Sequence, residues 1–231
     1  MQKNNFLFLG EAGSGKSEVA VNFAVELNKL GTKEVHFFDM DMTKPLFRSR
    51  DLKEHLENLG IHFHYEEQFM DAPVLTGGVR QCLQSDNCFV VMDIGGGDVG
   101  ARAVGGFAPL LNREDTTAYY VLNSYRPWSG DIDQIDKTMA LILGVSHIHL
   151  DQIHLVNNPN TGLHTTLEEF IAGKEKMEEM VSPYKPIDFT CIRKELLEDA
   201  KKLCDTSLMP LELYLTYPWA VGESQKNILS I

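Results

Sequence analysis

The sequence is poor in the residues that would indicate a disulfide, zinc or redox protein. Its 231 residues include only four cysteines, and no two of them form a Cys-x-x-Cys pair. Neither a zinc motif nor a thioredoxin-like site is therefore indicated, and disulfides are not expected in an intracellular protein. Apolar runs such as 89–92 and 140–143 are far shorter than the roughly 20 residues that cross a bilayer. No secretory signal opens the chain, so we expect a cytoplasmic protein.

Basic residues are also scarce. Lysine and arginine number 21 against 33 acidic residues, which gives a net charge of −12. Nucleic acids and anionic membranes are themselves polyanions and are not attracted by such a field. We therefore expect no nucleic acid partner and no nonspecific membrane binding. A small local basic site for a phosphorylated ligand is compatible with this charge.

The remaining composition is that of an ordinary globular protein, with 43% hydrophobic and 23% charged residues. A domain of this size buries about three quarters of the surface that its unfolded chain would expose, which provides a core without disulfides or metals. No internal repeat, low-complexity block or flexible linker divides the chain. We expect one domain over residues 1–231.

Short apolar runs alternate with amphipathic segments along the chain. The segment 41–84 is less regular, and its pattern is compatible with extra helices or with a mobile flap. Alternation of this kind predicts a mostly parallel sheet covered on both faces, a three-layer α/β/α fold. Ligands bind such sheets beyond the carboxyl ends of the strands. The predicted strands are 6–9, 35–38, 89–92, 118–122, 153–156 and 186–190, and the predicted helices are 19–30, 132–142, 166–181 and 194–203.

A complete phosphate-binding motif follows the first predicted strand. The run 10–17 matches G-x-x-x-x-G-K-[ST] at every fixed position, with a strand before it and a helix after it, as the motif requires. Glycines let successive backbone N–H groups converge on phosphate oxygens at the helix N-terminus. Lys16 is expected to reach the β- and γ-phosphates, and the Ser17 hydroxyl to bind Mg²⁺. The nucleotide-binding residues predicted here are Gly10, Glu11, Ala12, Gly13, Ser14, Gly15, Lys16 and Ser17.

Carboxylates end the next two strands. Asp39 and Asp41 close the second strand on one side of the extended chain, and Asp93 closes the third, like a Walker B aspartate. These residues are candidates to bind Mg²⁺ and to organise a water for attack on a γ-phosphate. Gly96 completes an Asp-x-x-Gly spacing, at which a backbone N–H can sense the γ-phosphate.

Together these motifs resemble the MinD/ParA branch of the SIMIBI class of P-loop ATPases, and the resemblance continues to Val156-Asn157 at the end of a later strand. It implies that Asp41 positions the attacking water and that Asp39 lies near Mg²⁺. It further implies that Asn157 contacts the base, and that 190–193, predicted as the loop after the sixth strand, lie near the adenine. No N-K-x-D guanine motif occurs, so the expected ligands are ATP or ADP with Mg²⁺.

The family resemblance also implies a slow Mg²⁺-dependent ATPase that acts as a switch for a protein partner or maturation client. Many members carry a lysine where this chain has Glu11, and that lysine reaches across a nucleotide-sandwich homodimer. A carboxylate would repel the partner's phosphates, so we expect no ATP-sandwich dimer. The basic membrane helix of MinD is not expected either, because 225–231 hold one lysine and are too short for an amphipathic anchor.

Two other functions remain open on the same motifs: a nucleotide-binding regulatory module without turnover, and a small-molecule phosphotransferase. Metal binding is open too. The pairs His62/His64 and His147/His149 alternate as in a strand, so each pair is able to ligate nickel or zinc. The simpler interpretation is ordinary hydrogen-bonded strand histidines, and Cys82 and Cys88 allow the same two interpretations.

Overall fold

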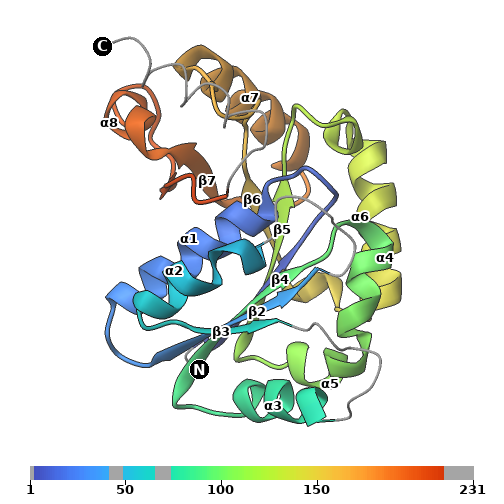
Figure 1. Cartoon of the computed structure of the whole chain (residues 1–231). Helices are drawn as coiled ribbons and strands as arrows, with labels where there is room; N and C mark the ends of the chain where they lie inside the picture. Colours follow the sequence, from blue (N-terminus) through green and yellow to red (C-terminus); the bar gives the residue numbers. More distant parts are fainter. Residues whose placement is uncertain (1–2, 42–48, 66–73, 216–231) are drawn as a thin grey trace, which may run out of the picture.

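The computed structural model describes residues 3–41, 49–65 and 74–215. Its strands form one eight-stranded sheet in the order β3-β2-β4-β1-β5-β6-β7-β8 (Figure 1). Every neighbouring pair in that sheet is parallel. The strands are β1 (Asn5–Leu9), β2 (Glu34–Met40), β3 (His62–Tyr65), β4 (Cys88–Ile94), β5 (Thr116–Leu122), β6 (Ile153–Asn157), β7 (Ile187–Arg193) and β8 (Leu208–Leu211). The helices are α1 (Lys16–Lys29), α2 (Lys53–Asn58), α3 (Val74–Leu83), α4 (Gly97–Ala101), α5 (Ala108–Leu111), α6 (Ile132–Ser146), α7 (Leu167–Val181) and α8 (Leu197–Ala200).

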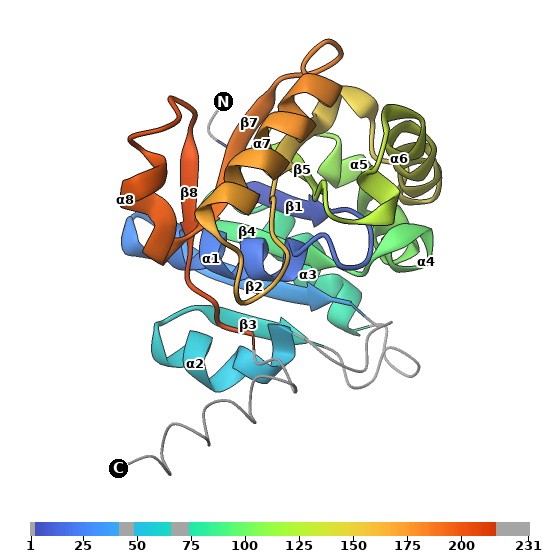
Figure 2. The ribbon, with the colours of Figure 1, turned by 90° about the horizontal axis from the view of Figure 1, so that it is seen from above.

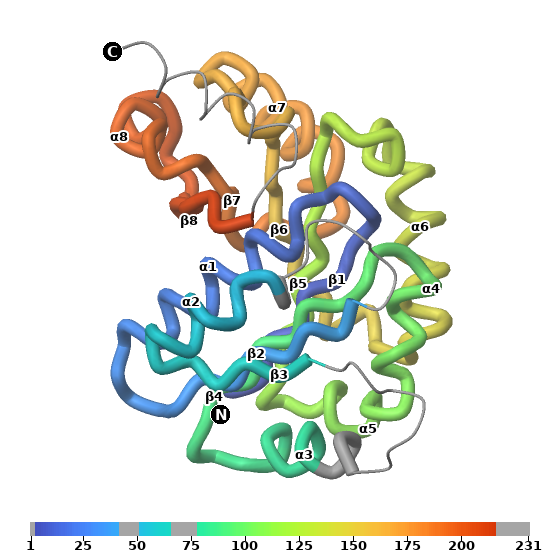
Figure 3. The backbone as a smooth tube through the Cα atoms, viewed as in Figure 1, coloured from blue at the N-terminus to red at the C-terminus, as the bar shows by residue number. Residues whose placement is uncertain are grey.

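Helices cover both faces of the sheet. Alternate side chains of β1 show why: Phe6 and Phe8 pack in one core with α1 and α2, whereas Leu7 and Leu9 pack in the other, with α3 to α6. Figures 1 and 3 show α1 and α2 on one side of β1, β2 and β4, and α4 and α6 on the other. Burial of both strand faces explains the nearly continuous apolar strand sequences. The predicted three-layer α/β/α architecture is therefore confirmed.

The order of the strands changes direction at β1. The chain runs from β1 out to β2 and β3, returns so that β4 lies beside β1, and then continues with β5 on the opposite side of β1. Figure 2 looks down on this arrangement. Connections that leave on opposite sides of one strand form the switch point at which open α/β sheets bind ligands. The loop 10–15 leaves β1 at this point.

The predicted strands and the longer helices are present, with ends that move by a few residues. Thr166 caps α7 in a reciprocal arrangement: its side chain accepts from the Glu169 N–H, and the Glu169 carboxylate accepts from the Thr166 N–H. The final predicted helix is shorter than 194–203, because only 197–200 are α-helical after a 3₁₀ turn at 194–196.

Two predictions about local structure were wrong. The run from His147 to His149 is not a strand, because His147 ends α6 in a left-handed conformation (φ 56°) and β6 begins only at Ile153. Ile148 is a single buried residue in this connection, which explains the misleading alternation. Residues 190–193 are not a loop but the last four residues of β7.

The irregular segment 41–84 contains α2, β3 and α3 in its described part. The C-terminal residues 225–231, where no membrane anchor is expected, lie outside the described residues. Among the described ranges, no helix combines the length and apolar character needed to cross a membrane.

Candidate functional site

The predicted phosphate-binding loop connects β1 to α1 at the carboxyl edge of the sheet. Gly15 caps α1 in the left-handed region (φ 87°), and no side chain caps the helix. A Cβ at Gly15 would overlap the amide nitrogen of Asn158. Glycine is therefore required here by the backbone conformation and by this close neighbour. The result is an uncapped N-terminus of a 14-residue helix, where backbone N–H groups favour an anion.

Three side chains from distant loops hold the backbone of this loop. Asn158 Nδ2 donates to the Ser14 carbonyl at 2.8 Å, Arg126 Nε donates to the Gly13 carbonyl at 2.9 Å, and Trp128 Nε1 donates to the Ala12 carbonyl at 3.1 Å. Consecutive carbonyls are thus held by protein donors, which fixes the loop before a ligand binds. Such preorganisation lowers the entropy that is lost on binding.

Four charged side chains of the predicted site are buried in the protein. Lys16 is 1% exposed, Asp39 and Asp41 are each 3% exposed, and Asp93 is fully buried. Asp39 and Asp93 are register partners on β2 and β4, and Asp39 Oδ1 accepts from the Asp41 N–H at 2.9 Å. Buried charges require partners of opposite sign or a cation. The structure thus buries the predicted lysine and all three predicted carboxylates, and it places Asp39 next to Asp41 and Asp93.

Residues 95–100 lie directly against the phosphate-binding loop. The Gly97 N–H donates to the Gly10 carbonyl at 3.2 Å, and a Cβ at Gly96 would stand 2.9 Å from the backbone of Ala12. Real Cβ atoms essentially never approach that closely. The Asp-x-x-Gly segment can therefore keep this contact only with glycine at position 96. A movement of either loop must therefore displace the other or break this contact.

Glu11 faces this same segment within its own chain. A Cβ at Gly97 would lie 3.3 Å from Glu11 Oε2. Partial burial raises the pKa of the Glu11 carboxyl, and Asp98 adds to the rise, whereas the Ala12 backbone and Lys16 oppose it. The side chain is therefore folded toward residues 97–98 in this structure.

A narrow pocket of about 40 Å³ lies beside Gly15. Its lining includes Glu18, Asn158, Cys191 and Arg193, so part of the predicted adenine-contacting segment 190–193 does border the phosphate-binding loop. Glu18 is almost fully buried, and its carboxylate accepts from the backbone N–H groups of Tyr214 and Leu215.

The predicted base contact Asn157 lies deeper than its neighbour Asn158. Asn157 is fully buried, and its amide donates to the Lys174 carbonyl at 3.4 Å. It is the register partner of Thr190 on β7. Among the described residues, Asn157 Oδ1 and Thr190 Oγ1 have no hydrogen-bond partner. Buried polar atoms of this kind usually have a partner such as water or a ligand.

Sequence reasoning did not find the loop-holding role of Asn158 and Arg126. Trp128 is also an anchor of the loop, because its indole N–H donates to the Ala12 carbonyl. Only the position of Asn158, directly after a strand end, was a usable signal.

No family model and no curated protein sequence matches this chain. Solved structures do resemble it in fold. FtsY from Mycoplasma mycoides superposes with a TM-score of 0.55 at 13% identity, over 81% of this chain and 60% of that one. Chloroplast FtsY from Physcomitrella patens gives 0.52 at 15% identity, over 82% and 58% of the two chains.

The signal recognition particle receptor FtsY from Elizabethkingia anophelis, solved in complex with GDP, gives a TM-score of 0.51 at 14% identity over 83% of this chain and 57% of that one. The present chain thus spans about 60% or less of the length of these proteins. Identities this low establish the fold alone. The chain therefore has the α/β P-loop NTPase fold of these structures, and membership of the MinD/ParA branch stays a prediction.

Proposed function

We propose that this protein is a nucleotide-dependent switch that binds Mg²⁺-ATP through residues 10–17, hydrolyses it slowly and acts on a protein partner or client. One observation carries the proposal: a complete phosphate-binding loop, held by distant donors, touches the Asp-x-x-Gly segment through the Gly97–Gly10 hydrogen bond. A terminal phosphate bound between these two loops would be sensed by both.

The residues present suit phosphate and magnesium. Magnesium prefers hard oxygen donors, and Asp39 and Asp93, adjacent on neighbouring strands, supply them together with the Ser17 hydroxyl. When bound, Mg²⁺ would neutralise charge on the phosphate oxygens. Lys16 would hold the β- and γ-phosphates with a charge-assisted hydrogen bond, and the Gly96 N–H would register the γ-phosphate.

Asp41 is proposed to orient the attacking water and to accept its proton. Its backbone N–H is fixed by Asp39, and its Oδ1 would lie 3.0 Å from a Cβ at Gly95. The carboxylate therefore faces the loop that follows β4, where a γ-phosphate would be held. A positioned base of this kind contributes about 10²–10⁴-fold to a reaction rate.

The base is proposed to be adenine, because the sequence lacks the N-K-x-D guanine motif. We propose that the adenine is faced by the end of β7 and by two side-chain oxygens without a hydrogen-bond partner among the described residues, Asn157 Oδ1 and Thr190 Oγ1. One structure of this fold contains GDP, so GTP is the direct competitor in any test.

The test is steady-state hydrolysis of ATP and of GTP, together with equilibrium binding of each. We expect ATP to bind more tightly than GTP and Asp41→Asn to bind ATP normally while its turnover falls by at least about 100-fold. Asp205→Asn, a change at an exposed site, is the matched control and should behave as wild type. Wild-type turnover in Asp41→Asn would refute the assigned role, and tighter GTP binding would refute the assigned base.

A further inference from the structure

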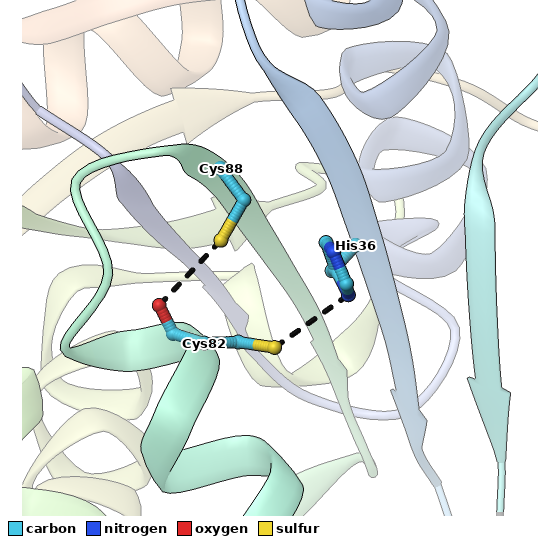
Figure 4. A group of neighbouring side chains, drawn as sticks. All are labelled: His36, Cys82 and Cys88. Carbon is cyan, nitrogen blue, oxygen red and sulfur yellow. Dashed lines mark hydrogen bonds between the residues drawn. The ribbon is translucent and has the colours of Figure 1, made fainter.

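A group of soft metal-binding side chains lies on the sheet outside the proposed nucleotide site. His36 of β2, Cys82 of α3 and Cys88 of β4 each present one ligand atom, and these atoms all lie within 4.8 Å of one another. Figure 4 shows the Cys82 thiol directed at the imidazole of His36, with Cys88 beside them. Three elements that are separate in sequence thus converge on one point. None of these residues belongs to the phosphate-binding loop or its carboxylates.

Two of the ligand-to-ligand distances are close to those of a tetrahedral zinc centre. With Zn–S near 2.3 Å and Zn–N near 2.0 Å, tetrahedral angles place a sulfur and a nitrogen ligand about 3.6 Å apart and two nitrogen ligands about 3.3 Å apart. Cys82 Sγ lies 3.5 Å from His36 Nδ1, and His64 Nε2 lies 3.0 Å from the same His36 nitrogen. His64 is not one of the residues whose ligand atoms lie within 4.8 Å of both thiols, so its ring would have to move toward them to complete a set of two thiolates and two imidazoles.

The fourth ligand comes from the edge strand. His36 pairs with His62 in the β2–β3 register, and Phe38 pairs with His64, so both β3 histidines share the sheet face of His36. His64 contacts the His36 nitrogen that faces Cys82. The Glu34 carboxylate lies 3.9 Å from the other nitrogen of His36, Nε2. Ligating histidines commonly have a carboxylate on the ring nitrogen that does not bind the metal.

Both thiols are sheltered from solvent, because Cys88 is buried and Cys82 is half-buried. The weak bond from the Cys88 thiol to the Cys82 carbonyl, 3.7 Å long, is easily exchanged for a metal bond.

We propose that His36, His64, Cys82 and Cys88 form a binding site for one zinc ion or a similar thiophilic d¹⁰ cation. Binding would release the two thiol protons and link β2, β3, β4 and α3. Because β2 and β4 also carry the aspartates of the proposed nucleotide site, the ion would brace the strands on which those aspartates stand. The zinc site itself does not depend on the proposed function.

The test uses the reduced, chelator-treated full-length chain, titrated with Zn²⁺ against a chromophoric chelator and separately with Co²⁺. We expect one tightly bound Zn²⁺ per chain. The Co²⁺ form should show the strong visible bands of a tetrahedral site and a thiolate-to-metal charge-transfer band. Cys82→Ser and His36→Asn should each weaken binding by more than about 100-fold, because even outer-shell partners are worth 10–100-fold.

Cys204→Ser is the matched control, since Cys204 is a partly exposed thiol outside the cluster, and it should bind as wild type does. Cys82 is half-buried, so its serine variant is expected to fold even where a change at buried Cys88 does not, and far-ultraviolet circular dichroism checks this. The proposal is overturned by absence of stoichiometric binding in the reduced wild type, by unchanged affinity in folded Cys82→Ser, or by a Co²⁺ spectrum without thiolate bands.

Discussion

Glu18 allows a quantitative test of how the C-terminal segment is held on α1. Its side chain is 4% exposed, and its two carboxylate oxygens accept from the N–H groups of Tyr214 at 2.7 Å and Leu215 at 3.2 Å. Burial raises its pKa from 4.5 to about 7, against the opposing effect of those two hydrogen bonds. Such a rise corresponds to about 3 kcal/mol of preference for the neutral carboxyl in the folded protein.

The sign of the pH effect follows from proton binding. Between pH 4.5 and about 7 the folded protein keeps a proton on Glu18 that the unfolded chain has released. The free energy of unfolding must therefore fall as the pH rises through this window, by up to about 3 kcal/mol, and the effect of this group levels off above it. His64, whose pKa is lowered to about 4, contributes a slope of the opposite sign in part of the same window.

The measured quantity is therefore the difference between wild type and Glu18→Gln. Urea unfolding of both proteins at a series of pH values from 5 to 8 supplies it, with Glu26→Gln, an exposed change on the same helix, as the control. Glutamine loses one acceptor, which lowers stability equally at every pH but cannot produce a slope. Wild type should lose about 2–3 kcal/mol relative to Glu18→Gln as the pH rises. Parallel profiles would refute the reasoning.

Two further predictions concern the loops of the proposed nucleotide site. Gly96→Ala should push residues 95–97 away from Ala12, which lowers the stability by about 1–3 kcal/mol and also lowers the nucleotide-dependent activity. Gly106→Ala is the control, because its Cβ would meet nothing within 4 Å. Equal thermal unfolding of the two variants would contradict the packing argument. Like charges 4 Å apart repel by about 4 kcal/mol at an effective dielectric constant of 20, so Glu11 should prevent an ATP-sandwich dimer. In sedimentation velocity, ATP should leave the wild type unchanged, whereas Glu11→Lys should dimerise when ATP is present. An ATP-induced wild-type dimer with Glu11 at the partner's nucleotide would show that account to be wrong.

Much of the fold was predictable because its strands are short, apolar and buried on both faces. Two strands were missed for local reasons. β3 reads His-Phe-His-Tyr, four residues with only one aliphatic or Phe side chain, so the alternation of His62 and His64 was its single signal, and β8 contains Pro210 within four residues. Edge strands tolerate such residues because they pair on one side only.

The candidate site was predictable where one short segment carries it. The phosphate-binding loop and the aspartates at strand ends are recognisable from local spacing. The donors that hold the loop are not, because Arg126 and Asn158 lie 113 and 144 residues from the carbonyls that they contact. The grouping of His36, Cys82 and Cys88 was not predictable for the same reason. Only the pairing of β2 with β4 and the packing of α3 bring these residues together.

The most direct test of the central claim is titration calorimetry of Mg²⁺-ATP into the wild type, Lys16→Ala and Lys29→Ala. Lys16 lies in the phosphate-binding loop, whereas Lys29 ends the same helix and is exposed. Loss of charged hydrogen bonds worth about 1.5–3 kcal/mol each should weaken ATP binding by at least about 100-fold in Lys16→Ala and leave it unchanged in Lys29→Ala. Equal ATP affinity in wild type and Lys16→Ala would contradict the claim that residues 10–17 bind the nucleotide.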